Sequence, residues 1–419
     1  ALASVAAGRW HGAGIDSRLM STSAGKFHSP IVDSLWAMRA AEQERVEGVK
    51  DPIILAAEPR AVSVSRTCVT YDFSSSPILG EHYRNPWGGI RVGRILEDLD
   101  ALAGTIAFKH TRPRAPHHLM LVTASVDRIV LLHNCGTEHD VHLSGSVAWV
   151  GRSSMVISLQ AHSDGVEGGR EPWLEADFTF VARDPVTKKA APINPLQTET
   201  AEEELRVVRV GESVNRRREL KKAQEPCAVG NQEQINALLA EAEPVLRMPA
   251  LANNDAVLLS ATRQGNAFVT QPQHRNTQNR IFGGLLMRRA YELAYATSFL
   301  FAGSRPHFVD VDRVDFLAPV DVGDLLKLDS CVLHTSPKRV AKEASRGVLI
   351  VRPPEVHVEV IASVTKPEAR SSKVSNTFSF SFSLPDADHV KRVLPTSSDE
   401  AARMLARAKV EEEAARVMP

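Results

Sequence analysis

The sequence predicts an α+β fold that is built twice within one chain. Residues 83–160 and 274–345 follow the same order, which is a loop with glycine, an apolar helical segment and then long strands. The tripeptide Val-Asp-Arg occurs once in each copy, at 126–128 and at 311–313, and this sets the register between them. One helix for every four or five strands favours a sheet wrapped around a single helix.

The strands that close the two copies support this fold class. Residues 174–184 and 375–384 each alternate between apolar and polar side chains. In the second segment Phe378, Phe380 and Phe382 share one face and serines occupy the other. A period of two is typical of a strand with one buried face, so both segments are predicted to border the core.

The N-terminal region, residues 1–59, is predicted as a transit-peptide remnant followed by an arm. Residues 1–30 contain three Arg or Lys and one acidic residue, Asp16, and are rich in Ala, Ser and Gly. This composition resembles the end of a mitochondrial transit peptide. The alternative is a disordered arm without a targeting role.

The first repeat is predicted to span 60–184 and the second 251–390. Their helical segments carry apolar residues at helical spacing, as in Ile95, Leu99 and Ile106 of the first. In the second repeat, Pro353-Pro354 is incompatible with a central strand, which predicts a loop or an excursion at a hairpin tip.

Two charged regions complete the chain. Residues 185–250 are predicted as a connector with short helices, because they combine a charge run with a helical pattern over 231–246. Residues 391–419 are predicted as a tail with a charged helix over 398–417, lying on the surface or docked on a partner.

Composition and missing motifs limit the possible functions. Lys+Arg and Asp+Glu are both 50, so the chain has no overall positive charge for dispersed nucleic-acid binding. No apolar run approaches the roughly 18 residues needed to cross a bilayer. The four cysteines are far apart, which favours free thiols over a zinc site. The sequence has no GxSxG, GxxxxGK[ST] or HExxH motif. A hydrolase with this sequence would need another way to activate water.

Five segments in order resemble one known family, the mitochondrial acyl-coenzyme A thioesterase 9 family, whose members are double-hotdog thioesterases. The resemblance covers about residues 60–385 and rests on YRNPWGGIRVGRILEDLDALAG, VAWVGRSSM, FVARDPVTKKAAPINPL, HRNTQNRIFGGLLMRRAYELAYA and GSRPHFVDVD. It implies two hotdog domains, hydrolysis of fatty acyl-CoA to fatty acid and CoASH without a cofactor in the mitochondrial matrix, and oligomerisation.

A hotdog arrangement suggests how such a chain activates water. A carboxylate on the central helix of one domain acts on water, and the bare N-terminus of the facing helix polarises the thioester carbonyl. Gly283 and Gly284 begin the second helix and leave room for a ligand at its backbone. The alternative is that these glycines only permit close packing between helix and sheet.

The resemblance gives two composite sites. Site one joins Asp100 of the first helix to the loop of the second domain, with Asn276, Asn279 and Gly284. Asp100 is the expected carboxylate. Glu97 and Asp98 are weaker candidates, since they also suit an exposed face near a helix N-terminus.

Site two joins Glu292 of the second helix to the first-domain loop, with Asn85 and Gly93. Its loop carries Pro86 and Trp87, and Glu292 is also spaced to pair with Arg288. We expect at most one competent site per chain.

The CoA phosphates require cations and hydrogen-bond donors. Equivalent turns of the two repeats supply Arg152 and Ser153 in the first, and Lys338 and Arg339 in the second. These residues also suit ordinary hairpin turns facing water. His274 and Arg275 are further phosphate candidates.

Three functions stay open at this level. The first is an acyl-CoA thioesterase. The second is a catalytically silent hotdog scaffold, serving as a structural subunit of a larger mitochondrial assembly such as a ribosome or respiratory complex. The third is an acyl-CoA sensor. The retained set of Asp100, Asn276, Asn279 and Gly284 favours the enzyme.

Overall fold

The computed structural model describes residues 28–47, 58–111, 119–164, 171–223, 232–248, 255–276, 280–312, 314–342 and 349–417. Both repeats have the predicted order of one long helix followed by strands. The first half contains helix α5 (Val92–Thr111) and strands β2 (Thr67–Tyr71), β3 (Met120–Leu131), β4 (Val141–Val150), β5 (Ser154–Ser163) and β6 (Leu174–Arg183). The second half contains helix α8 (Gly283–Ala302) and strands β9 (Gln264–Val269), β10 (His307–Val311), β11 (Val314–Phe316), β12 (Leu325–Ser336), β15 (Glu355–Lys366) and β16 (Ser371–Ser383).

The strands form one continuous antiparallel sheet in the order β2-β4-β5-β6-β3-β10-β16-β15-β12-β9, with β11 also pairing β3 and β16. The two halves join where β3 meets β10 and β11, for example at Val130 opposite Asp310 and Val126 opposite Val314. Outward from this seam, the first half has the order β3-β6-β5-β4-β2, and the second half has the corresponding order β10-β16-β15-β12-β9. The sheet is therefore two related half-sheets, each wrapped around its own helix, which is the tandem hotdog α+β fold that the sequence predicted.

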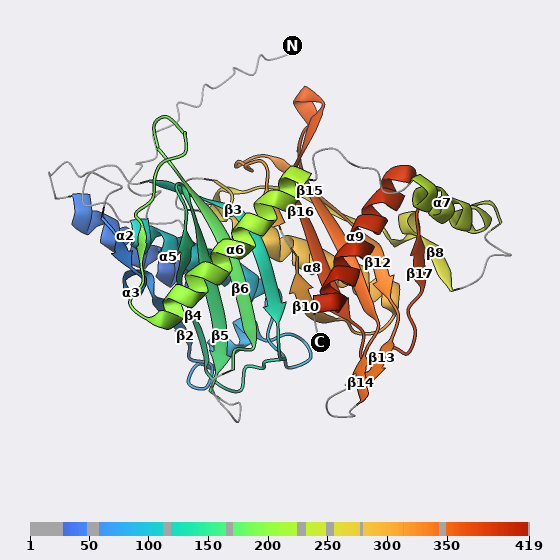
Figure 1. The fold of residues 1–419 in the computed structure, drawn as a ribbon, viewed down its shortest axis with the longest axis horizontal. Coiled ribbons are helices and arrows are strands. Elements are labelled where there is room, and N and C mark those ends of the chain that lie inside the picture. Colours follow the sequence, from blue (N-terminus) through green and yellow to red (C-terminus); the bar gives the residue numbers. More distant parts are fainter. Residues whose placement is uncertain are drawn as a thin grey trace, which may run out of the picture.

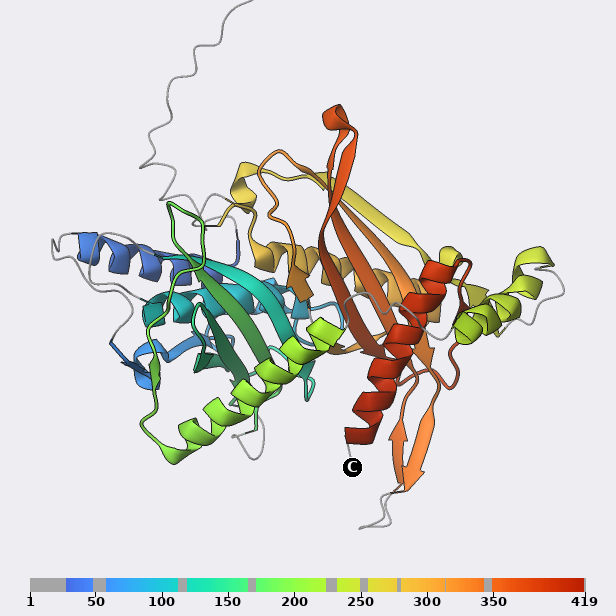
Figure 2. The same ribbon diagram turned by 45° about the horizontal axis from the view of Figure 1, so that its top comes forward.

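Helices cover both faces of the sheet. Helices α5 and α8 pack against each other on one face, while α6 (Ala201–Ala223) and α9 (Ser398–Val417) lie across the opposite face (Figures 1 and 2). The predicted alternation in β16 is confirmed, because Phe378, Phe380 and Phe382 are fully buried. The rings of Phe380 and Phe382 lie about 6 Å from that of Tyr291 on α8.

The remaining elements are short or peripheral. They are helices α2 (Pro30–Glu47), α3 (Val62–Ser65), α4 (Pro77–Tyr83) and α7 (Gln232–Arg247), 3-10 helices η1 (Leu259–Thr262), η2 (Pro272–His274) and η3 (Pro367–Ala369), and strands β1 (Arg60–Ala61), β7 (Leu196–Gln197), β8 (Ala256–Leu258), β13 (Arg339–Lys342), β14 (Leu349–Arg352) and β17 (Arg392–Leu394). Within the described residues, no helix is long and apolar enough to cross a membrane.

Several local expectations are met. The predicted helix over 398–417 is α9, and it docks on the sheet of its own chain, where Arg403 pairs with Glu359 and Arg407 pairs with Asp312. Pro353-Pro354 follows β14, so the β13–β14 hairpin is the predicted excursion from the sheet (Figure 1). Cys68, Cys135 and Cys331 are free thiols, and Cys227 lies outside the described residues.

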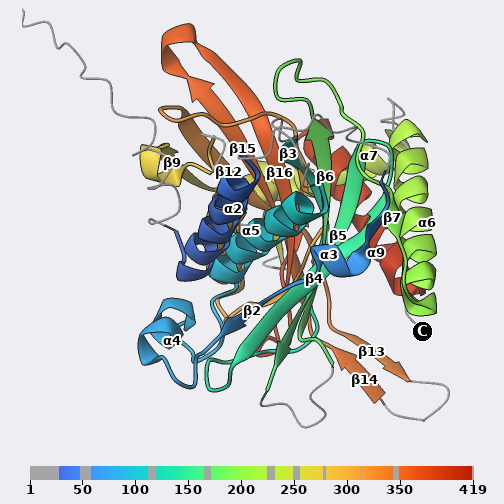
Figure 3. The same ribbon diagram turned by 90° about the vertical axis from the view of Figure 1, so that its left-hand side faces the viewer.

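The N-terminal region differs from the predicted arm. Residues 1–27, which carry the transit-peptide prediction, lie outside the described residues. Residues 30–47 form helix α2, which packs along α5 (Figure 3). Its inner face buries Val32, Leu35 and Trp36, so this segment belongs to the core of the first half.

Candidate active site

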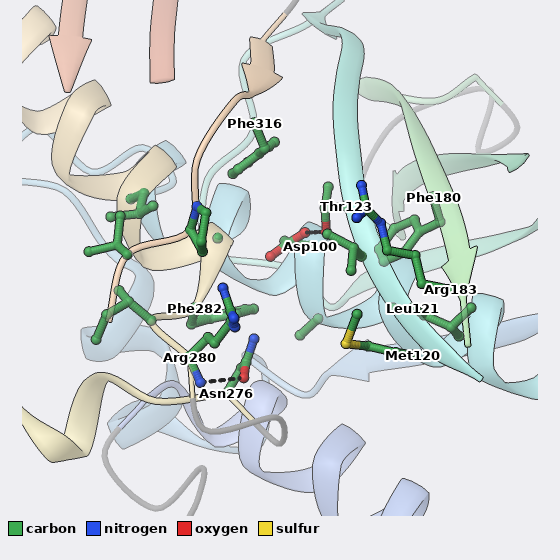
Figure 4. Close-up of a pocket in the computed structure, with 18 of the residues that line it drawn as sticks. Asp100, Met120, Leu121, Thr123, Phe180, Arg183, Asn276, Arg280, Phe282 and Phe316 are labelled. Atoms are coloured by element: carbon green, nitrogen blue, oxygen red, sulfur yellow. Dashed lines mark hydrogen bonds between the residues drawn. The ribbon is translucent and has the colours of Figure 1, made fainter. Parts of the chain in front are cut away.

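Asp100 is the centre of a site shared by the two halves. It projects from the middle of α5 and its carboxylate is buried. Thr123 of β3 donates its hydroxyl proton to Oδ1 at 3.1 Å, and the backbone N–H of Gly284, at the start of α8, donates to Oδ2 at 2.8 Å. Site one of the sequence prediction is thus brought together at Asp100 and Gly284. Thr123, which Figure 4 shows beside Asp100, is an addition to it.

The two glycines allow the close packing that the sequence suggested, while room for a ligand at their backbone stays a prediction. A Cβ on Gly283 would lie 3.0 Å from Asp100 Oδ2, and one on Gly284 would lie 2.8 Å from the carbonyl oxygen of Glu97. Both contacts are tighter than ordinary packing allows. The glycines therefore let α8 approach α5 closely, and the same closeness brings its N-terminal backbone to the carboxylate. Phe282 at the N-cap gives no side-chain cap, so backbone donors stay available there.

The surroundings of Asp100 adjust its acidity. Burial raises the pKa of Asp100 to about 6, against the opposing effects of the Thr123 and Gly284 hydrogen bonds and the Arg39 charge. A carboxyl with this pKa is mostly ionised near neutral pH, yet it is far more basic than an exposed aspartate. This combination suits a general base.

The two acids beside Asp100 have structural partners rather than exposed positions. The buried carboxylate of Glu97 pairs with His28 at 2.9 Å, Arg288 at 3.2 Å and Arg94 at 3.3 Å. These partners hold the pKa of Glu97 below its usual value although burial alone would raise it. The suggestion of an exposed face for Glu97 and Asp98 is therefore wrong.

Asp98 is the acceptor of a buried hydroxyl cluster. Tyr71 and Tyr83 donate to its Oδ2 at 2.9 and 2.5 Å, and the Ser29 hydroxyl donates to Oδ1. Burial raises the pKa of Asp98 to about 7. With every oxygen engaged, Asp98 joins α5 to β2, to α4 and to the residue before α2.

A cavity of about 640 Å³ opens at Asp100. Its walls come from both halves, with an apolar side from Leu121, Phe180, Phe282 and Phe316. Figure 4 shows Asp100 between β3, which carries Met120, Leu121 and Thr123, and the loop that carries Asn276 and Arg280. The cavity thus combines an apolar lining with one buried carboxylate, as expected for a small-molecule site.

Four basic side chains line this cavity. Arg183, Lys188 and Arg280 are exposed, and Lys188 has a left-handed backbone with φ of 59°. Arg39 of α2 also lines the cavity and is less exposed than these three. None of these four was predicted, because they come from loop and helix positions whose proximity depends on the folded chain.

Asn276 is placed at the cavity, as predicted. It lines the wall, and its Oδ1 accepts the backbone N–H of Arg280 at 3.1 Å, which closes the loop before α8. Asn279 lies outside the described residues.

Comparison with known proteins gives the family of this chain. It is 45% identical over 398 residues to acyl-coenzyme A thioesterase 4, mitochondrial, of Humulus lupulus, an alignment that covers 91% of this chain and 73% of that protein. The chain belongs to the acyl-coenzyme A thioesterases. It is also 43% identical to acyl-coenzyme A thioesterase 2, chloroplastic, of the same plant, covering 91% of this chain and 89% of that one. It is 36% identical to human acyl-coenzyme A thioesterase 9, mitochondrial, covering 77% and 72%. No protein-family model matches the chain.

The second composite site of this thioesterase is assembled differently from the prediction. The two loop segments, 83–93 and 274–284, align Gly93 with Gly284 and Asp100 with Tyr291. The ring of Tyr291 lies 3.2 Å from where a Cβ on Gly93 would be. Phe308 takes the place of Thr123. The cavity here measures about 210 Å³, and Tyr291, Tyr295, Trp87 and Phe308 line it. Aromatic rings replace the carboxylate and its hydroxyl donor.

The other residues predicted for site two have local partners. Glu292 lies outside the lining of this smaller cavity and pairs with Arg288 at 2.9 Å and Arg289 at 3.3 Å. Asn85 lines it, but its Oδ1 accepts backbone N–H groups from Trp87 and Gly89, both at 3.0 Å. Within the part of the chain that the structure describes, the side chains nearest to Gly93 are therefore Tyr291 and Arg288 and not a carboxylate.

The residues predicted for CoA phosphates do not line the larger cavity. Arg152 and Ser153 lie in the turn between β4 and β5, and Lys338 pairs with Asp388 at 2.9 Å. Arg339 begins the β13–β14 excursion. The cations at the cavity itself are better placed for a ligand bound at Asp100.

Proposed function

We propose that this chain hydrolyses acyl-CoA thioesters at the composite site around Asp100. One observation supports the proposal above all. A buried carboxylate from the first half accepts a hydrogen bond from the N-terminal backbone of the helix in the second half, at the wall of an apolar cavity. The proposal is also supported by the relatives of this chain, which are named acyl-coenzyme A thioesterases.

The chemistry follows from the positions of these groups. Ionised Asp100 removes a proton from a water molecule as the water oxygen bonds to the thioester carbonyl carbon. The positive end of α8 favours the negative charge that develops on the carbonyl oxygen. The intermediate then breaks its C–S bond, and the proton held by Asp100 passes to the CoA thiolate. Thr123 and the Gly284 N–H hold the carboxylate in position.

Release of CoA thiol from a series of acyl-CoAs tests the proposal directly. The purified chain should release one thiol for each acid formed, and dialysis against a chelator should leave the rate unchanged because the proposed base is Asp100. A folded protein that releases no thiol from any chain length would contradict the proposal. It would favour a scaffold or a sensor instead.

The pH profile should report the ionisation of Asp100. Because the base must be ionised, kcat/KM should be full at high pH and fall below a pKa of about 6. The measurement is kcat/KM for one acyl-CoA between pH 4 and 8, which extends about two pH units to each side of that pKa. A profile that is flat through pH 6 would assign the base to another group.

The exposed cations that line the cavity, Arg183, Lys188 and Arg280, are proposed to bind the CoA phosphates. Replacing Arg280 with Ala should raise KM for an acyl-CoA by about tenfold, the effect of losing about 1.4 kcal/mol of charge-assisted binding, with kcat nearly unchanged. Arg183→Ala and Lys188→Ala should act in the same direction.

A truncated substrate and a matched variant control this prediction. With acyl-pantetheine, which lacks the nucleotide phosphates, Arg280→Ala should match the wild type. Arg152→Ala, on the remote β4–β5 turn, should leave KM for acyl-CoA unchanged. An equal loss with both substrates would show that Arg280 acts on the cavity rather than on phosphate.

The proposed location is the mitochondrial matrix. It is supported by the transit-peptide-like composition of residues 1–30 and by the mitochondrial names of two relatives. The relative named chloroplastic makes plastids the alternative. Imaging of the fluorescently tagged protein expressed from its complete gene separates the two, and a signal outside mitochondria would contradict the proposal.

A further inference from the structure

Helix α2 is fixed against the catalytic helix at its start. His28, just before α2, pairs with Glu97 at 2.9 Å, and Ser29 donates to Asp98. Trp36, one of the residues lining the cavity, packs edge-on against Phe282 with ring centroids 5.1 Å apart. These contacts hold the inner face of α2 as one wall of the cavity.

Arg39 is the charged residue that α2 presents to this cavity. Its guanidinium carbon lies 5.5 Å from the centre of the Phe108 ring. Among the residues that the structure describes, it has no hydrogen-bond or salt-bridge partner. Burial lowers the pKa of Arg39 to about 10, with the charge of Asp100 opposing that effect, so the group stays protonated at neutral pH. The charge of Asp100 acts on Arg39 without forming a hydrogen bond or ion pair with it, so the guanidinium keeps donors for an anion supplied by a ligand in the cavity.

The position of Arg39 restricts which part of a ligand it meets. Its Nη1 lies 3.4 Å from where a Cβ on Gly104 would be. Gly104 is four residues after Asp100, so both lie on one face of α5, about 6 Å apart. Arg39 is therefore about one helical turn from the proposed reacting carbonyl. The long pantetheine arm separates the CoA phosphates from the thioester, so the phosphates do not reach Arg39. The exposed cations Arg183, Lys188 and Arg280 are the ones proposed to bind them.

We propose that Arg39 binds a carboxylate at the far end of the acyl group, so that the substrates of this site are dicarboxylic acyl-CoAs with a short chain, such as glutaryl-CoA. This inference rests on the proposed thioesterase function and names its substrate class. Gly104 lines the cavity without a Cβ, and the guanidinium of Arg39 lies between this position and the Phe108 ring. The apolar walls accommodate the methylene groups.

A shape-matched pair of substrates tests the inference. Glutaryl-CoA and 5-methylhexanoyl-CoA have the same acyl outline, but two methyl groups replace the carboxylate oxygens in the second. The wild type should prefer glutaryl-CoA in kcat/KM by about 100-fold or more, as expected for a buried charged hydrogen-bond partner. Arg39→Met should abolish or reverse this preference, and Arg39→Lys should retain part of it.

Two outcomes would overturn the inference. One is a wild type that does not prefer glutaryl-CoA. The other is an equal loss with both substrates in Arg39→Met, which would mean that Arg39 acts only through the charge of Asp100.

Calorimetric binding of the two non-hydrolysable thioether analogues separates this inference from the proposed function. Tighter binding of the glutaryl analogue that disappears in Arg39→Met supports the inference even if no thioester is turned over. Equal binding of both analogues contradicts it even if hydrolysis is rapid.

Discussion

Replacing Asp100 with Asn should lower kcat/KM for acyl-CoA by about 10²–10⁴-fold, the usual range for loss of a general base. Asn keeps the size of the side chain and can still accept the Gly284 N–H, but it cannot take a proton from water. The fold should survive because the change removes a buried charge rather than adding one. Thiol release under kcat/KM conditions measures the effect.

Glu292→Gln is the matched control for this substitution. Glu292 is the carboxylate that the sequence suggested for the second site, and the structure pairs it with Arg288 and Arg289 instead. This variant should stay within about threefold of the wild type, since partly exposed ion pairs contribute little. A large loss in Glu292→Gln with full activity in Asp100→Asn would place the chemistry at the second site.

Replacing Asp98 with Ala should have the largest effect on stability, lowering the free energy of unfolding by about 3–5 kcal/mol. Asp98 accepts hydrogen bonds from Ser29, Tyr71 and Tyr83, all buried. Removing the acceptor strands three hydroxyls in the core, and each unpaired group costs about 1–3 kcal/mol. Denaturant unfolding followed by circular dichroism gives the change.

Two further variants define the origin of that loss. Tyr71→Phe removes one donor and leaves Asp98 with two, so it should lose about 1 kcal/mol. Asp164→Ala, at an exposed site where the carboxylate pairs with His142, should be nearly neutral. If Asp98→Ala were as stable as Asp164→Ala, the hydroxyl cluster would not contribute to folding.

Much of the fold was predictable because it depends on local periodicity. The alternation around Phe378, Phe380 and Phe382 and the apolar spacing of α5 and α8 are direct consequences of burial on one face. The pairing of Asp100 with Gly284 was also predictable, although they are 184 residues apart, because repeat order and family resemblance place the two helices together.

Other parts of the site depend on packing that the sequence does not reveal. Helix α2 has no clear amphipathic pattern, so neither it nor Arg39 was predicted. Thr123 is one polar residue in a strand, and only the sheet brings it to Asp100. The choice of Glu292 for site two was a register error of one position. Aligning Gly93 with Gly284 matches Asp100 to Tyr291, and a change of one residue on a helix rotates the side chain by about 100°.

The central claim is that each chain has one acyl-CoA site, built around Asp100 from one half and the start of α8 from the other. Calorimetric titration of the purified chain with a non-hydrolysable acyl-CoA thioether tests it most directly. The account predicts one site per chain, with Arg280→Ala weakening that binding. Two equivalent sites per chain, or binding that is insensitive to Arg280→Ala but lost when Tyr291 is altered, would contradict it.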